Sequence, residues 1–259
     1  MARRKLYHLW GYGNSGTTFM VNNVAVSLAA KGVDVAILDT AQDKTMYYIY
    51  TKNEEALKEI AENCMENLSN DICEGIEAEN GISVYTRVDD NTFINNVEKI
   101  LETLLKNHTL ILIDCDVTTP PKYFKYAQEV YIVQSMDTYN IPNLTAFLDK
   151  LEHDRFLDNR KIKIIINKFV DIKGITEKEI ISNLAYYNDP ATLYMKAVLH
   201  TERVEYMVVP FYESVYEKYI EMVTESDIKF DEYPLEFIKI INELSNEIFP
   251  MTKSEEEEE

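Results

Sequence analysis

The chain has 259 residues, of which 46% are hydrophobic, and a formal net charge of −19. This length can bury a full hydrophobic core, and the acidity opposes non-specific attraction to DNA or anionic lipid, because both require clustered Lys and Arg. The longest apolar runs, at 109–113 and 162–167, are far shorter than the roughly 20 residues of a membrane-spanning helix, and the first residues lack the apolar core of a secretory signal. We therefore expect a cytoplasmic protein without a membrane span.

Short apolar runs typical of buried strands alternate with helix-length amphipathic stretches. The predicted strands are 5–10, 35–38, 82–88, 110–113, 130–133, 162–166 and 206–209. The predicted helices are 18–31, 53–70, 95–107, 141–154 and 234–249. This alternation predicts an α/β fold in three layers, a mostly parallel twisted sheet flanked by helices. No Pro-, Gly- or Ser-rich linker interrupts it, so we expect a single domain over 1–252 and a disordered acidic tail at 253–259.

The segment between the first predicted strand and the first predicted helix is rich in glycine. Gly11, Gly13 and Gly16 are three of only seven glycines in the chain. Glycines in this position let the backbone turn tightly and direct its N–H groups at an anion, and the following helix N-terminus adds partial positive charge. The spacing fits the phosphate-loop pattern G-x-x-x-x-G-K-[ST], except that Thr17 replaces the lysine; Thr18 keeps the hydroxyl that binds Mg²⁺ in such loops. The alternative is a tight turn without a ligand.

An acid follows each of two other predicted strands, Asp39 after 35–38 and Asp114 after 110–113. In open parallel sheets, ligands bind beyond the carboxyl ends of the strands. Carboxylates there hold Mg²⁺ or orient an attacking water at phosphate sites. We therefore predict that Asp114 binds metal with Thr18, and that Asp39 activates water if the protein is an enzyme. Asp116 is expected to be a solvated loop acid instead.

The cysteines and histidines indicate no further chemistry. Cys64, Cys73 and Cys115 form an odd set without close-paired spacing, which supports neither a disulfide framework nor a zinc site, so we expect three free thiols. The four histidines are scattered along the sequence, none beside a Cys or Ser, and His-based catalysis is therefore not expected.

In order along the chain, the motifs "GYGNSGTT", "VAILDT", "LILIDCD", "VQSMDTYNIPNLTAFLDKL", "IKIIINK" and "MVVPFYESVYEKYIEM" resemble the MinD/ParA class of deviant-Walker P-loop ATPases over nearly the whole chain. The segment from "VQSMDTYN" to "IIINK" looks most similar to the ATPase domain of the TadZ/CpaE proteins, which position tight-adherence pilus machinery. The resemblance implies a P-loop NTPase-like fold, with ATP or ADP and Mg²⁺ as ligands. It also implies a homodimer that closes around two ATP molecules and dissociates after hydrolysis.

The same resemblance assigns roles to individual residues. Asp39 matches the water-activating acid and Asp114 the Walker B acid, while Asn167 in "IIINK" matches a residue that reads the adenine base. The implied nucleotide-binding set is Gly11, Tyr12, Gly13, Asn14, Ser15, Gly16, Thr17, Thr18 and Asn167. The chain also departs from the family at both lysines of the loop. Thr17 replaces the lysine that contacts the phosphates, and Tyr12 replaces the lysine that crosses the dimer interface. Ala41 stands where many relatives have a second acid.

The missing lysines affect binding and hydrolysis differently. A charge-assisted hydrogen bond contributes roughly 1.5–3 kcal/mol, so its loss at position 17 weakens triphosphate binding by about ten- to a hundredfold. Hydrolysis depends more strongly on such cations, because they stabilise charge that develops in the transition state. We therefore expect ATPase activity to be absent or very weak, unless Lys44 or Lys122 supplies the charge.

Three segments bear on partners. The tyrosine-rich run at 45–55 is expected to be partly buried loop and helix start, with a partner surface as the alternative. The apolar stripe of 234–249 is expected to pack on the core rather than on a membrane, because the polar face of this helix is acidic. An aromatic Tyr12 at the dimer interface allows a constitutive, nucleotide-independent dimer as a further hypothesis.

These features favour a MinD/ParA-like nucleotide-binding or pseudo-ATPase positioning protein, a dimeric scaffold for a bacterial pilus, secretion or conjugation apparatus and its protein partners. Two alternatives stay open, a plasmid or chromosome partition factor of the same fold and a nucleotide-free structural or regulatory subunit. Charge disfavours DNA, but one set of residues offers a local basic patch: Arg155, Arg160, Lys161, Lys163, Lys168 and Lys173. Salt-dependent binding to duplex DNA tests the first alternative, and failure to bind any nucleotide favours the second.

Overall fold

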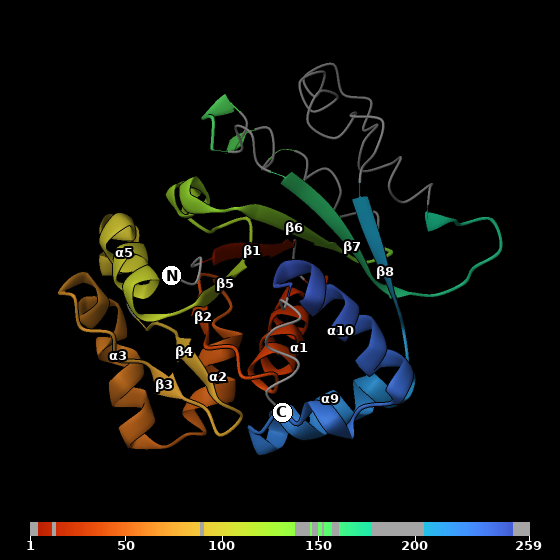
Figure 1. The fold of residues 1–259 in the computed structure, drawn as a ribbon, viewed down its shortest axis with the longest axis horizontal. Helices are drawn as coiled ribbons and strands as arrows, with labels where there is room; N and C mark the ends of the chain where they lie inside the picture. Colours follow the sequence, from red (N-terminus) through yellow and green to blue (C-terminus); the bar gives the residue numbers. More distant parts are fainter. Residues whose placement is uncertain are drawn as a thin grey trace.

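One twisted sheet forms the centre of the computed structural model (Figure 1). The structure describes residues 5–11, 14–88, 91–137, 146, 150–151, 153–156, 161–177 and 205–250. Within them the strands are β1 (Lys5–Gly11), β2 (Val35–Asp39), β3 (Ile76–Glu77), β4 (Ile82–Tyr85), β5 (Leu110–Cys115), β6 (Glu129–Gln134), β7 (Lys161–Phe169) and β8 (Glu205–Pro210). Their order is β3-β4-β2-β5-β1-β6-β7-β8, and every pairing is parallel except that of β3 with β4. The predicted α/β fold class is confirmed.

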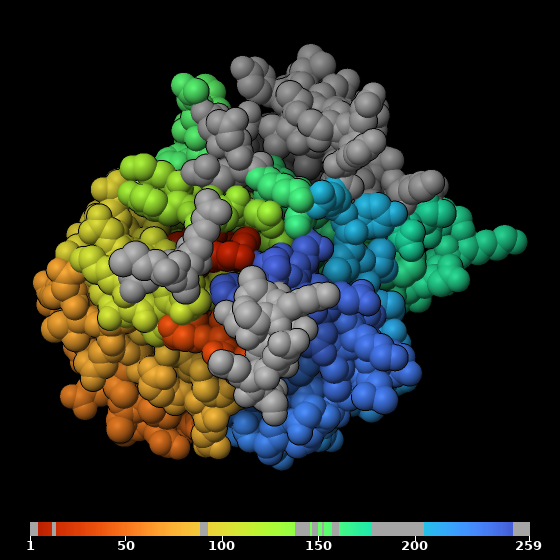
Figure 2. Space-filling model, in the orientation of Figure 1, coloured from red at the N-terminus to blue at the C-terminus, as the bar shows by residue number. Residues whose placement is uncertain are grey.

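Helices cover both faces of this sheet. They are α1 (Thr17–Ala29), α2 (Thr45–Thr51), α3 (Glu55–Ser69), α4 (Asn91–Asn95), α5 (Val97–Asn107), α9 (Glu213–Glu225) and α10 (Leu235–Ile248), with 3-10 turns η1 (Pro121–Tyr126) and η4 (Phe230–Glu232). Side chains of α3 and α5 form the core on one face, and those of α1, α9 and α10 form the core on the other. Figure 2 shows the orange and yellow N-terminal half beside the blue C-terminal helices, with only small patches of the red first segment reaching this face.

The strands are apolar at successive positions because both of their faces are buried. In β1, Leu6 and Trp10 belong to the core with α3 and α5, while Tyr7 and Leu9 belong to the core with α1 and α10. The sequence "LILI" of β5 follows the same rule. This is the pattern of a parallel sheet enclosed between two helical layers.

The boundaries differ from the predictions in a few places. The predicted strand 82–88 ends at Tyr85, because Thr86 and Arg87 leave the ladder to donate hydrogen bonds to Asp39 Oδ2 (2.9 Å) and to the Ala41 carbonyl (3.0 Å). The strand β3, the helices α2, α4 and α9, and the 3-10 turns η1 and η4 were not predicted as such. The predicted helix 141–154 lies largely outside the described residues, and the tail 253–259 lies wholly outside them.

The last helix packs on the core, as predicted. Phe237, Ile241, Leu244 and Ile248 are buried against the α1 side of the sheet, and Leu235 at the first position is 69% exposed. Among the described residues, no helix combines the length and apolar character needed to cross a bilayer.

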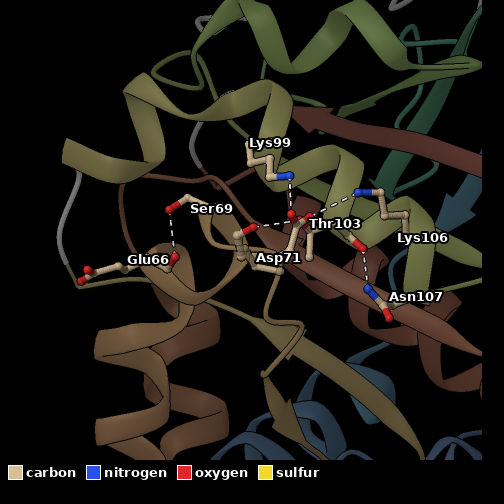
Figure 3. A network of polar contacts seen from close by, with 8 residues as sticks. Glu66, Ser69, Asp71, Lys99, Thr103, Lys106 and Asn107 are labelled. Atoms are coloured by element: carbon tan, nitrogen blue, oxygen red, sulfur yellow. Dashed lines mark hydrogen bonds and ion pairs between the residues drawn. The ribbon is translucent and has the colours of Figure 1, made fainter.

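A polar network joins the C-terminal end of α3 to α5 (Figure 3). Asp71, with a left-handed φ of 63°, accepts hydrogen bonds from Lys99 Nζ (2.5 Å) and Lys106 Nζ (3.2 Å). Thr103 Oγ1 donates to the Leu68 carbonyl at 2.8 Å. The hydrogen bond from Lys99, followed by that from Lys106, lowers the pKa of Asp71. The network holds the chain that leaves α3 against α5.

A buried lysine ties α10 to the sheet. Lys163 of β7 is 6% exposed and forms ion pairs with Glu247 of α10, with Glu129 of β6 at 3.4 Å and with Glu205 of β8 at 3.6 Å. Burial opposes the charged form of Lys163, but the hydrogen bond that its ammonium group donates to Glu247 and the charge of Glu129 outweigh burial and raise the lysine pKa. The Lys163 ammonium group therefore links β6, β7 and β8 to α10.

We predict that Lys163→Met lowers the free energy of unfolding by about 2 kcal/mol, measured by urea denaturation. Removing one partner of a buried pair costs about 3–5 kcal/mol, and the partial exposure of the three glutamates reduces this. Lys161→Met is the matched control, because the Lys161 side chain is 49% exposed in its pair with Glu205 and such surface pairs contribute about 0–1 kcal/mol. Equal losses in the two variants would contradict the prediction.

Candidate functional site

A cavity of about 620 Å³ opens at the carboxyl edge of the sheet, where the predicted site residues come together. Its wall includes Gly11 from the end of β1, the first residues of α1, Asp114 from β5 and Asn167 from β7. Beyond the carboxyl ends of parallel strands is where ligands bind in this architecture. The grouping of residues far apart in sequence follows from the parallel order of the strands.

The glycine loop is wound so tightly that two glycines are required. At Gly11 a Cβ atom would lie 2.2 Å from Ser15 Oγ and 2.4 Å from Thr17 Oγ1. Gly16 has φ +88°, and a Cβ there would lie 2.4 Å from Asn167 Nδ2. Tyr12 and Gly13 lie outside the described residues. The described part of the loop therefore leads directly into α1, whose first turn has no side-chain cap and no acidic residue, as an anion site at a helix N-terminus requires.

Thr18 and Asp114 form the centre of the predicted metal site. Thr18 Oγ1 donates a hydrogen bond to Asp114 Oδ2 at 2.6 Å. Asp114 is 1% exposed, and its Oδ1 is buried without a hydrogen-bond partner. Burial, with the nearby charge of Asp39, raises the pKa of Asp114 well above its usual value. A hydroxyl next to a carboxyl group with one unpartnered oxygen fits Mg²⁺, which prefers hard oxygen ligands.

Asp39 lies directly beside Asp114 but behind the wall of the cavity. The two residues are paired in the register of β2 with β5, and Asp39 is fully buried. Its carboxyl oxygens accept hydrogen bonds from Thr86 Oγ1 (2.9 Å) and the Ala41 N–H (3.2 Å). Burial raises the pKa of Asp39 to about 6, although the charge of Arg87 opposes the shift. The acid that lines the cavity from this loop is Asp43.

A bulge in β7 holds the glycine loop from the outside. The register between β7 and β8 shifts between Ile166 and Phe169, and Lys168 has a left-handed φ of 56°. Asn167 Nδ2 donates to the Ser15 carbonyl at 2.9 Å, and Lys168 Nζ donates to the Asn14 carbonyl at 2.9 Å. The amide group of Asn167, which the family resemblance assigned to the adenine base, binds the loop here.

Lys168 is also the single Lys or Arg that lines the cavity in the described part of the chain. Its pKa is lowered by burial. Lys44, one of the two residues considered as substitutes for the missing loop lysine, donates instead to the Val88 carbonyl at 2.7 Å. Lys122, the other, lies on η1 and does not line the cavity. Sequence analysis did not assign Lys168 this position, because only the bulge brings it there.

An aromatic wall completes the cavity on the side of β8 and α9. Its members follow the last strand or lie on the last two helices: Phe211, Tyr212, Tyr216, Tyr219 and Phe237. Sequence analysis did not assign these residues to the site, although the segment "PFYESVY" directly follows a predicted strand. The cavity thus has a polar end at the glycine loop and an aromatic end at α9.

Other predicted residues lie outside this site or have local roles. Asp116, expected to be a solvated loop acid, is partly buried and lines the cavity, and it accepts hydrogen bonds from the Gln42 N–H (2.8 Å) and the Thr118 N–H (2.7 Å). In the tyrosine-rich run, Tyr50 is buried and donates to Asn22 Oδ1 at 2.7 Å, while Tyr48 is 69% exposed.

The hypothetical basic patch is largely neutralised. Lys161 is paired with Glu205 at 2.7 Å, Lys163 is buried among glutamates, and Lys168 binds the glycine loop. Arg160 lies outside the described residues. Lys161, Lys163 and Lys168 are thus engaged in these contacts, while Arg155 and Lys173 are exposed.

No protein-family model matches the sequence, and no curated protein matches it. Solved structures do match its fold. A plasmid partition protein of Borrelia burgdorferi B31 bound to AMPPNP aligns with a TM-score of 0.63 and 13% identity, covering 95% of this chain and 98% of its own. The MinC:MinD cell division complex of Aquifex aeolicus aligns at 0.64 and 15%, covering 96% and 97%. The septum site-determining protein MinD of Pyrococcus horikoshii OT3, complexed with Mg-ADP, aligns at 0.62 and 14%, covering 98% and 99%.

These alignments extend over nearly the whole of each chain. The protein therefore has the MinD/ParA-type P-loop NTPase fold, in agreement with its strand order and its strand–glycine loop–helix unit. The sequence identities are low, so the likeness is one of fold.

We predict that Asp39→Asn raises the free energy of unfolding at pH 7.5 by about 2 kcal/mol, measured by urea denaturation. Because the Asp39 pKa is higher in the folded state, at about 6 against 3.8, folding takes up a proton between these values, and stability falls as pH rises through this range. A shift of about two pKa units corresponds to about 3 kcal/mol, from which the loss of one hydrogen bond subtracts about 1 kcal/mol.

At pH 4 the gain disappears, since the wild-type carboxyl group is then largely protonated in the folded state. Asp171→Asn, at an exposed position, is the control and leaves the pH profile unchanged. An Asp39→Asn variant less stable than the wild type at pH 7.5 would contradict the assignment.

Proposed function

We propose that this chain is a nucleotide-binding positioning protein of the MinD/ParA family, with ATP or ADP bound in the cavity at the carboxyl edge of the sheet. The observation that carries the proposal is the Thr18–Asp114 hydrogen bond at the start of α1, directly after a glycine loop. A hydroxyl and a carboxyl group in this arrangement support a Mg²⁺ site of the kind that P-loop proteins have. The Mg-ADP bound to Pyrococcus horikoshii MinD and the AMPPNP bound to the Borrelia burgdorferi partition protein support the choice of ligand.

Different residues of this chain bind different parts of the nucleotide. The loop N–H groups and the positive end of α1 bind the phosphates, and Thr18 and Asp114 hold Mg²⁺, which neutralises phosphate charge when bound. The aromatic wall takes the apolar faces of the base, because stacking on aromatic rings is favourable for any base. The Asn167 and Lys168 side chains keep the loop in shape.

The protein is a pseudo-ATPase, or at most a very slow enzyme. Thr17 provides a hydroxyl, 3.0 Å from Ser15 Oγ, where the loop pattern has an ammonium group. Asp39, the acid expected to activate water, is buried behind the cavity wall with both oxygens hydrogen-bonded. Thr17 therefore brings no positive charge to the reacting phosphate, and Asp39 brings no carboxylate to it. Charged groups at this point have the largest effect on the rate.

Its role is that of a cytoplasmic dimeric scaffold for a bacterial pilus, secretion or conjugation apparatus, as the likeness to the TadZ/CpaE ATPase domain suggests. A nucleotide-dependent switch of this kind acts through protein partners. The second candidate is a plasmid partition factor, favoured by the fold of the Borrelia burgdorferi partition protein. The net charge of −19 and the paired lysines argue against its DNA-binding part.

Titration calorimetry with ATP and ADP, with and without Mg²⁺, tests nucleotide binding. We expect Mg²⁺-dependent ATP binding with a Kd of about 0.1–1 mM, because one charge-assisted bond of about 1.5–3 kcal/mol is missing from a site of micromolar scale. Thr18→Ala abolishes the Mg²⁺ dependence, and Thr224→Ala, whose hydroxyl binds only the Ile220 carbonyl on α9, does not. Absence of heat from either nucleotide at several millimolar would contradict the proposal and favour a nucleotide-free subunit.

Lys168→Met is expected to weaken ATP binding by about tenfold, since it removes the cation of the cavity wall and one anchor of the loop. Lys44→Met is the matched control, because the Lys44 ammonium group binds the Val88 carbonyl. The same calorimetry measures both. A loss of affinity in the Lys44 variant alone would show that the loop after β2, and not the β7 bulge, supplies the charge.

A further inference from the structure

A second cluster of reactive side chains lies at the amino ends of β2 and β5, away from the cavity. Asp34 immediately precedes β2, His108 follows α5 and precedes β5, and Cys73 lies between α3 and β3. Tyr85, the last residue of β4, reaches into the same cluster with its hydroxyl group. Sequence analysis placed no histidine beside a cysteine, and the fold corrects this: the residues that meet here are separated by up to 74 positions.

The geometry is that of a thiol, a base and an orienting acid. His108 Nδ1 is 2.8 Å from Asp34 Oδ1. His108 Nε2 is 3.7 Å from Cys73 Sγ and 2.7 Å from the Tyr85 hydroxyl, which is itself 3.1 Å from Cys73 Sγ. An imidazole within reach of a nucleophile and oriented by a third group is the arrangement that activates nucleophiles.

The surroundings favour a charged imidazole next to a partly exposed cysteine. Burial opposes the charged form of His108, but the hydrogen bonds to Cys73 and Asp34 outweigh it and raise the His108 pKa. The other ionisable groups acting on the cluster are Glu77, whose charge acts on Tyr85, and Cys64. Cys73 is partly exposed, whereas Cys64 and Cys115 are buried. Asp71, two residues before Cys73, is fixed to Lys99 and Lys106 of α5 (Figure 3), which helps to hold the thiol near His108.

We propose that Cys73 is a peroxide-reactive thiol, a modification site distinct from the nucleotide cavity and independent of the proposed function. Cys73 transfers its proton to His108, and the resulting thiolate is stabilised by the Tyr85 O–H and the His108 N–H. The thiolate sulfur attacks one oxygen of hydrogen peroxide and the O–O bond breaks. Sulfur is oxidised to sulfenic acid, and the leaving hydroxide takes the proton from His108 and departs as water. Partly exposed thiols beside an imidazolium have the required reactivity.

The first test measures the rate at which iodoacetamide alkylates each cysteine at pH 7, by peptide mass spectrometry. We expect Cys73 to react about fivefold or more faster in the folded chain than in the same chain unfolded in urea, since an ordinary thiol is only a few per cent thiolate at this pH. Cys64 and Cys115 react more slowly when folded. His108→Gln returns the Cys73 rate to that of the unfolded chain and moves its pH profile toward higher pH, while Asp34→Asn gives an intermediate profile.

The controls separate activation from exposure and from loss of structure. Tyr85→Phe keeps the ring that fills the core and removes only the hydroxyl, so it lowers the rate severalfold without unfolding the chain, as circular dichroism verifies. Dimedone labelling after treatment with hydrogen peroxide detects the sulfenic acid at Cys73. The proposal is overturned if folded Cys73 reacts no faster than the unfolded chain, if neither His108→Gln nor Tyr85→Phe changes its rate, or if no dimedone adduct forms at Cys73. None of these readouts depends on nucleotide binding.

Discussion

Two carboxyl groups buried side by side at the carboxyl edge of the sheet impose the main constraint on this protein. Asp39 and Asp114 are adjacent because β2 and β5 pair in parallel register. Burial of a charged carboxylate is costly unless hydrogen bonds or counter-charges compensate it. The compensation is unequal: Asp39 has Thr86, the Ala41 N–H and the charge of Arg87, while Asp114 has Thr18 and one oxygen without a partner. Under the proposed function, Asp39 is therefore a structural acid, and Asp114 is the one that a divalent cation would stabilise.

The glycine loop is stabilised by hydroxyl groups and by side chains from β7, and not by a lysine of its own. Its interior is filled by the hydroxyl groups of Ser15 and Thr17, which lie too close to Gly11 for any side chain there. Its exterior is held by Asn167 and Lys168, whose side chains donate hydrogen bonds to two successive carbonyl groups, those of Ser15 and Asn14. A loop held in shape before binding loses less conformational entropy when a ligand arrives. Retained shape with reduced charge is consistent with a protein that binds nucleotide and does not hydrolyse it efficiently.

The two chemical centres use opposite ends of the same strands. Asp34 immediately precedes β2, which ends at Asp39, and His108 shortly precedes β5, which carries Asp114 near its end. Both strands are fully buried, and the cavity and the Cys73 cluster lie at their opposite ends. The reactivity proposed for the Cys73 thiol therefore depends on Asp34, His108 and Tyr85 and not on the residues of the cavity.

The sequence alone determined the fold class and the outline of the site. Successive apolar residues identify strands buried on both faces, glycine clustering identifies the loop, and an acid after a strand identifies the carboxyl edge, since each of these features depends on local geometry. The tertiary structure alone decided which acid lies behind the wall, which lysine lines the cavity, and which histidine meets a cysteine. A β-bulge redirects Lys168, the chain after β4 brings Thr86 to Asp39 and Arg87 to the Ala41 carbonyl, and the amino ends of β2 and β5 bring Asp34 and His108 together. These outcomes depend on strand register and on contacts between residues distant in the chain, which no local pattern of residues records.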